Sequence, residues 1–201
     1  PYDIPEHRAD TINDGQKMFR WSDYKWNPSG NGSTFTKYDG NDGKTTLDPE
    51  DDAAHVNMGG TWKMPTKEQV TELFKETTQE LYAKLKEGSD PVKVANGTYN
   101  ENDGSVLWTY DGHTPDEAYA KLAYMKLLSS NGNFLVVPSF VKAYDGYVDP
   151  VGSGGHFWSS SLDSQNVGNA WYGDFNDANY GVGNIGNGRY VGFGVRGVVC
   201  Q

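Results

Sequence analysis

The last fifty residues, 152–201, constrain the fold of this chain most. They contain three short aromatic segments typical of β-strands, at 156–159, 170–175 and 189–199, separated by a stretch dense in Gly, Asn, Asp and Tyr. A hydrophobic core does not need so many Asn and aromatic residues between its strands. The pattern therefore predicts framework strands that present a polar and aromatic loop region.

The final segment alternates in polarity, which predicts one strand over 189–199. Glycines on the second face indicate a close neighbour there. The residues that share the apolar face are Val191, Phe193, Val195 and Val199, with Gly192 and Gly194 on the other face.

Three helices are predicted upstream from their start signals. Asp48 is placed as the N-cap of the first, with Pro49 at its first position, and Gly59 and Gly60 end it. The second begins at Thr66, which forms a capping box with Gln69. Its apolar stripe, which runs to Gly88, is Val70, Leu73, Phe74, Thr77, Leu81 and Leu85.

The third predicted helix begins with a capping box of Thr114 and Glu117, and its apolar face is Ala118, Leu122, Met125 and Leu128. A hairpin is expected over 96–112 and a buried strand over 134–137, and residues 1–46 are expected to form short strands and loops. The order, without βαβ alternation, predicts an α+β fold in which two to three helices pack on small antiparallel sheets. The length suits a single domain over 1–201.

The composition excludes several classes of function. The formal net charge of -10 argues against nucleic acid and anionic membrane surfaces as partners. No apolar run approaches the length of a membrane span. Cys200 is the single cysteine, so neither an intrachain disulfide nor a cysteine-based zinc site can form. We expect no cofactor.

Several segments together resemble the Fibrobacter succinogenes major paralogous domain family. They read TTLDPEDDAAHVN at 45–57, GGTWKMPT at 59–66, NGNFLVVP at 131–138, GHFWSSS at 155–161 and YVGFGVR at 190–196. The resemblance covers roughly 37–199 and implies a C-type-lectin-like fold in a surface or secreted protein of Bacteroidota. Any signal peptide or lipid anchor would then lie upstream of Pro1.

The chain departs from the family pattern at three places. Met58 stands where the family often carries Trp, and Gly197 where it often has Pro. The stretch 80–130 is longer than the usual linker and is predicted to be a helical insertion. The formylglycine-generating oxidase, a relative in fold, needs a pair of cysteines, which a chain with Cys200 alone lacks.

Residues 163–190 are the predicted ligand-binding surface, because Asn offers adaptable hydrogen bonds and aromatic rings offer rigid contacts to sugars or proteins. The alternative is that these Asn residues only supply turns. A more specific possibility is that a retroelement diversifies this stretch. The predicted contact residues are Asn169, Trp171, Tyr172, Asp174, Asn176, Asn179, Tyr180, Asn184, Asn187 and Arg189.

No metal site is predicted. The sequence lacks an EF-hand loop and the Glu-Pro-Asn, Gln-Pro-Asp and Trp-Asn-Asp motifs of calcium-dependent sugar binding. An ion held by Asp174 and Asp177 with nearby Asn is the weaker alternative. His55 and His156 are interpreted as structural hydrogen-bonding residues, and no nucleophile elbow or His-Glu-x-x-His motif occurs.

The sequence therefore predicts a non-enzymatic binding or adhesion module, extracellular or at the cell surface, whose partner is a glycan or a protein on another cell. One alternative is a retroelement-diversified receptor-binding protein of a phage or mobile element. Others are a structural pilus or fibre component, and a hydrolase, which would need a cleft of convergent titratable groups. The sequence does not give the oligomeric state.

Overall fold

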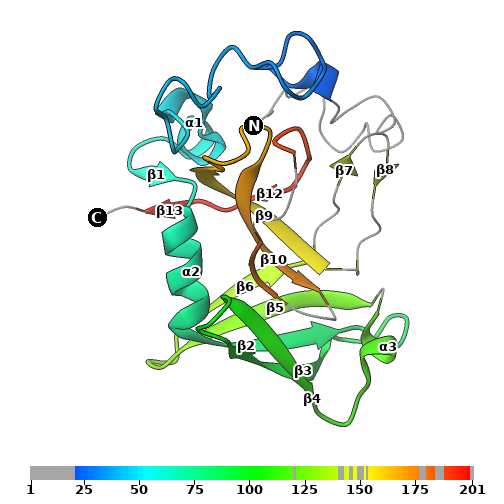
Figure 1. The fold of residues 1–201 in the computed structure, drawn as a ribbon. Coiled ribbons are helices and arrows are strands. Elements are labelled where there is room, and N and C mark those ends of the chain that lie inside the picture. The colour runs from blue at the N-terminus through cyan, green and yellow to red at the C-terminus, as the bar shows by residue number, and fades with distance from the viewer. Residues whose placement is uncertain are drawn as a thin grey trace.

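The computed structural model describes residues 21–119, 121–139, 143–144, 147–148, 152, 154–176, 180–183 and 188–199. It is an α+β protein with few helices and mostly antiparallel strands (Figure 1). Its largest element is a nine-stranded sheet in the order β12-β9-β10-β11-β4-β3-β2-β5-β6. The predicted α+β class is therefore confirmed.

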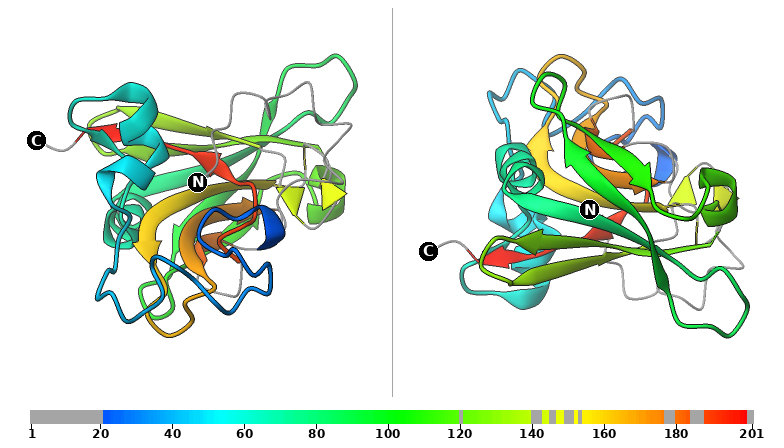
Figure 2. Two further views of the ribbon diagram at one scale, coloured as in Figure 1. Left: turned by 90° about the horizontal axis from the view of Figure 1, so that it is seen from above. Right: turned by 90° about the horizontal axis from the view of Figure 1, so that it is seen from below.

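One half of the large sheet is an antiparallel layer formed by the middle of the chain. The view from below shows these strands laid out across that side of the molecule (Figure 2). They are β2 (Thr77–Ala83), β3 (Val92–Tyr99), β4 (Ser105–Tyr110), β5 (Leu122–Ser129) and β6 (Phe134–Pro138).

The other half is formed by the C-terminal strands, and β11 joins the halves by pairing with both β10 and β4. Only β12 pairs in parallel, with β9, among the strands of this sheet that the structure describes. The strands are β9 (Gly154–Leu162), β10 (Ala170–Asn176), β11 (Tyr180–Gly183) and β12 (Gly194–Val195). Two small ribbons pair β1 (Trp62–Lys63) with β13 (Val198–Val199), and β7 (Ala143–Tyr144) with β8 (Tyr147–Val148).

The first helical region begins later than predicted. A 3₁₀ turn, η4 (Pro49–Asp51), precedes α1 (Ala53–Met58). The N-cap of α1 is Asp52, whose carboxylate accepts from the amides of Ala54 and His55, while Asp48 makes no side-chain cap bond. The predicted end of the helix at Gly59 is confirmed.

Helix α2 (Lys67–Lys75) has the predicted Thr66–Gln69 capping box but is less than half as long as predicted. The chain turns into β2 because Thr77 bonds its hydroxyl back to the carbonyl of Leu73 and the following residues bury alternate side chains. Leu81 is fully buried and fits a strand period as well as a helical one. The predicted continuation to Gly88 is wrong.

The predicted helical insertion over 80–130 is also wrong, because this stretch forms strands of the main sheet. The Thr114–Glu117 capping box exists, but α3 (Pro115–Ala118) is a single turn. Met125 and Leu127 are buried as alternate residues of β5, where apolar side chains pack on the core. The capping box therefore predicted correctly where the helix begins, but it did not predict how many residues the helix contains.

The predicted hairpin over 96–112 is confirmed as β3 and β4, and the strand at 134–137 as β6. Phe134, however, is 63% exposed, so that strand is buried only in part.

The predicted single strand over 189–199 is wrong: β12 and β13 are separate, and Val195 and Val199 are 42% and 49% exposed. Residues 21–46 hold a 3₁₀ turn, η3 (Trp21–Asp23), and an isolated bridge at Thr46 rather than short strands.

Two clusters of buried side chains hold the described residues together. The larger lies between α2 and the sheet and centres on Phe74, Leu81 and Phe175. The smaller lies beneath α1 and includes Trp158 and Tyr172. In Figure 1, β9 and β10 stand above the β2–β6 layer with α2 alongside, so the C-terminal strands contribute to both clusters.

Candidate ligand-binding groove

Trp171 lies in a polar groove where three distant segments meet. The indole is on β10, Lys67 is the first residue of α2, and Thr46 bridges to Ser161 on β9. We call this surface the Trp171 groove. It is lined by Thr45, Thr46, Lys67, Glu68, Ser161, Leu162, Asp163, Ser164, Gln165 and Trp171.

The Trp171 groove has a volume of about 440 Å³, within the range of small-ligand sites. Its lining is mostly hydroxyl, amide and charged groups around one half-buried indole. Such a lining offers hydrogen bonds to a ligand rich in hydroxyl groups and a flat apolar surface for one of its faces. The groove is therefore chemically suited to a polar ligand with an apolar face.

Lys67 and Trp171 form the most distinctive contact of the groove. The Lys67 ammonium lies 3.2 Å from the centroid of an indole ring, a cation–π contact. The backbone amide of Lys67 donates to the Ser161 hydroxyl at 2.9 Å, which fixes the start of α2 against β9. Within the described part of the chain, no carboxylate forms an ion pair with this ammonium, so it can contact a ligand.

A second groove, of about 390 Å³, shares Thr46 with the first. It is lined partly by Asp52, His55 and Trp62 and is the more apolar of the two. The His55 ring nitrogen Nδ1 lies 3.2 Å from the Trp62 carbonyl oxygen, a contact that agrees with the structural role predicted for this histidine.

Three predicted contact residues are buried, with exposed fractions of 6% for Tyr172, 7% for Asp174 and 8% for Arg189. Tyr172 packs on Trp158 and Phe193 in the smaller core cluster. Their burial argues against direct contact with a ligand, because β10 is buried on both faces from Tyr172 to Phe175 and Arg189 is buried next to the Gly188 bridge.

The other predicted residues divide into two groups. Asn169 and Asn176 are half-buried, and their carbonyl groups accept hydrogen bonds from the Asp163 amide and from the Trp108 indole. Tyr180 belongs to β11, where its backbone pairs with Val106. Those that lie outside the described residues are Asn179, Asn184 and Asn187, together with Asp177.

The sequence did not single out Lys67, Glu68, Thr45 and Thr46 as site residues. Because they lie at a helix start and in an irregular segment, their sequence positions do not predict that they lie next to a strand far away in the sequence. The only available signal was the capping box at Thr66, which places Lys67 at the exposed first turn of a helix.

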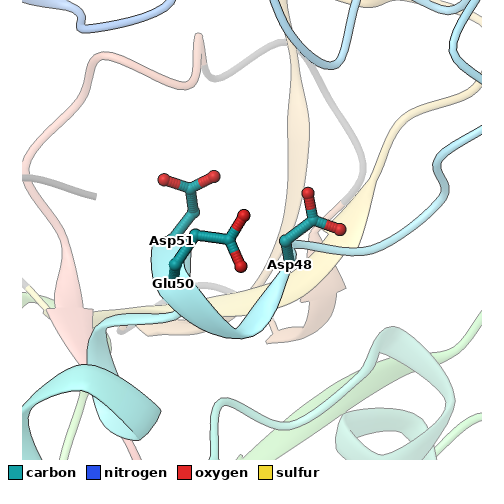
Figure 3. Close-up of side chains that lie close together, drawn as sticks. All are labelled: Asp48, Glu50 and Asp51. Atoms are coloured by element: carbon teal, nitrogen blue, oxygen red, sulfur yellow. The ribbon is translucent and has the colours of Figure 1, made fainter.

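A cluster of carboxylates at η4 is a separate candidate, for a metal ion. Oxygen atoms of Asp48, Glu50 and Asp51 lie within 4.8 Å of one another, and Figure 3 shows the three side chains close together on one turn. The Lys37 ammonium contacts all three, at 2.7 Å from Asp48 and 3.1 Å from Glu50. The cluster is therefore an ion-pair network in which a lysine supplies the positive charge.

Electrostatics within this network favour its charged form. Burial alone would lower the pKa of Lys37, but its bonds to the three carboxylates outweigh burial and raise it. Burial alone would raise the pKa of Asp51, yet hydrogen bonds from Lys37, Tyr38 and Lys25 hold it below its ordinary value. The network joins the segment 25–38 to the turn that precedes α1.

No protein-family model, curated protein or solved structure matches the chain in sequence or fold comparisons. None of the helices in the described ranges combines the length and the apolar character needed to cross a membrane.

Proposed function

We propose that this chain is a non-enzymatic binding module with a C-type-lectin-like fold, part of a surface or secreted protein, which recognises a glycan or a protein on another cell. The observation that carries the proposal is the Trp171 groove, where an indole and an ammonium stand among hydroxyl and amide groups. The sequence resemblance described above is what supports the C-type-lectin-like fold in this proposal.

Carbohydrate recognition fits this lining well. A pyranose ring has an apolar face that stacks on an aromatic ring, and its hydroxyl groups need both donors and acceptors. Thr45, Thr46 and Gln165 provide both, and Lys67 adds a donor beside the indole. Asn179, Asn184 and Asn187, which lie outside the described residues, remain predicted contacts.

A glycan array and a cell-binding assay with the purified chain test this proposal. Trp171→Ala should abolish or strongly weaken binding. Tyr172 is unsuitable for such a test, because its removal would disturb the core. Equal binding by Trp171→Ala would show that the site is elsewhere, and the absence of any ligand on both assays would count against the proposed function.

Trp26→Ala is a matched control, since Trp26 is another half-buried indole with a lysine on its ring. The Lys25 ammonium lies 4.2 Å from the Trp26 ring centroid, and Trp26 does not line the Trp171 groove. This variant loses an equivalent side chain and cation–π contact. It should fold and retain ligand binding.

A further inference from the structure

Arg189 is a buried cation with no carboxylate in ion-pair contact among the residues that the structure describes. Its side chain is part of a residue only 8% exposed, and its Nη1 donates to the Tyr38 carbonyl at 3.1 Å. Its Nε and Nη2 groups have no hydrogen-bond acceptor among the described residues. A buried charge in this state is unfavourable unless something neutralises it and accepts its hydrogen bonds.

The side chains around Arg189 are mostly aromatic. Its guanidinium carbon lies 4.2 Å from the Phe35 ring centroid and 5.4 Å from that of Tyr24. Asp42 acts on Arg189 only through space, and its carboxylate accepts a hydrogen bond from the Tyr38 amide. Rings on the face of the guanidinium leave its in-plane N–H groups as the places where an acceptor can bind.

A small cavity, of about 30 Å³, adjoins this guanidinium. Two polar groups in its lining are already engaged: the Ser159 hydroxyl donates to the Trp171 carbonyl, and the Trp158 indole donates to the Val191 carbonyl. The cavity is lined by Arg189 with Tyr24, Leu47, Met64, Trp158, Ser159, Leu162 and Ala170.

The size and charge of the cavity define what it can hold. A volume of about 30 Å³ suits one monatomic ion or water molecule and is too small for a sugar or a peptide side chain. A water molecule could accept from two N–H groups but would bring no negative charge next to the guanidinium. An anion satisfies both requirements, since hydrogen bonds to a charged acceptor are the stronger ones.

We propose that Arg189 and this cavity bind a small inorganic anion, chloride under physiological conditions. The anion would stabilise the junction between the N-terminal segment, which supplies Tyr24 and Phe35, and the C-terminal strands. Leu162 lines both this cavity and the Trp171 groove, so the two adjoin at this residue. The proposal stands independently of the identity of the groove's ligand.

Thermal unfolding in sodium chloride, sodium bromide and sodium gluconate at equal ionic strength tests the proposal. Each tenfold rise in halide above its dissociation constant should raise the Tm by about 3 to 6 °C, and gluconate should not. Arg189→Met should remove this dependence, while Arg196→Met, the same change at a half-buried arginine, should keep it. Equal Tm values in the three salts, or an unchanged halide effect in Arg189→Met, would refute the proposal.

A second measurement does not require the variant to fold. Crystals of the unaltered protein soaked in sodium bromide should show an anomalous peak within hydrogen-bonding distance of Arg189 Nε and Nη2. The absence of a peak, with water in its place, would overturn the proposal. Trp171→Ala should retain the halide effect, so failure of the groove as a binding site and failure of the anion site can be told apart.

Discussion

Asp52 links the start of α1 to the segment after β1, and its replacement by Ala should be strongly destabilising. Its Oδ1 accepts from the amides of Ala54 and His55 at 2.9 and 3.0 Å. The Met64 amide donates to Oδ2 at 2.9 Å. Asp52 is 4% exposed and Met64 1%, so water cannot replace these bonds without opening the structure.

The magnitude of the effect follows from the two kinds of bond that are lost. Loss of an N-cap costs about 1 kcal/mol. A buried amide left without an acceptor, here that of Met64, costs roughly 1–3 kcal/mol more. For a total near ~3 kcal/mol, a chain of this size should show a Tm lower by about 6 to 12 °C.

Thermal and urea unfolding followed by circular dichroism measure this difference, with Asp48→Ala as the control. Among the described residues, the side chain of Asp48, the N-cap predicted from the sequence, forms ion pairs with Lys37 and Lys44 and no cap bond. Its removal should lower the stability far less than the removal of Asp52, because ion pairs of this kind contribute little. If Asp48→Ala destabilises the protein as much as Asp52→Ala, the assignment of the cap is wrong.

Three further predictions concern stability. Because the pKa of Asp51 is below its ordinary value, the stability that this carboxylate provides is present above about pH 4 and is lost as the pH falls through its folded-state pKa. Asp51→Asn should therefore reduce the loss of unfolding free energy in acid, and an unchanged acid profile would contradict the ion-pair network. Burial and the hydrogen bond to Glu80 raise the pKa of Tyr82 to about 12, so the unfolding free energy should fall between about pH 10 and pH 12. Tyr82→Phe should reduce that fall, and a fall of equal size in the variant would refute the assignment of this pH dependence to Tyr82. Gly97→Ala should destabilise by about 1–3 kcal/mol in urea unfolding, because the new Cβ would lie 2.6 Å from Val106 Cγ1, and a neutral effect would show that the β3–β4 packing is looser than described.

Local signals in the sequence were reliable where the structure depends on neighbouring residues. Both capping boxes, at Thr66 and Thr114, form as predicted, because each needs only four consecutive residues. The hairpin over 96–112 and the aromatic strands that became β9 and β10 are also present. These features depend on short-range hydrogen bonds and on alternation of polarity.

Element length could not be predicted from the same signals. Leu81 and Met125 fit both a helical and a strand period, and pairing between β2 and β5 over tens of residues decided for strands. Asp48 and Asp52 are equally good caps by residue type, and contact with the distant Met64 amide selects Asp52. Contacts between segments far apart in the sequence make these choices.

The candidate site shows the same division. The sequence predicted Trp171 as a contact residue, and its side chain lines the polar groove. It did not distinguish Trp171 from its neighbour Tyr172, because β10 becomes buried on both faces from Tyr172 onward through packing on segments far away in the sequence. Lys67 could not be predicted, since its contact with Trp171 joins a helix start to a strand about a hundred residues away.

The most direct test of the proposed function is the dissociation constant of the best glycan or protein ligand from the array, measured calorimetrically. For Trp171→Ala we expect it to rise about 30-fold or more, the effect of losing an aromatic anchor worth about 2 kcal/mol. For Trp26→Ala it should stay within about twofold of the unaltered protein. Equal affinities in all three proteins would contradict the central claim that this chain binds its ligand through the Trp171 groove.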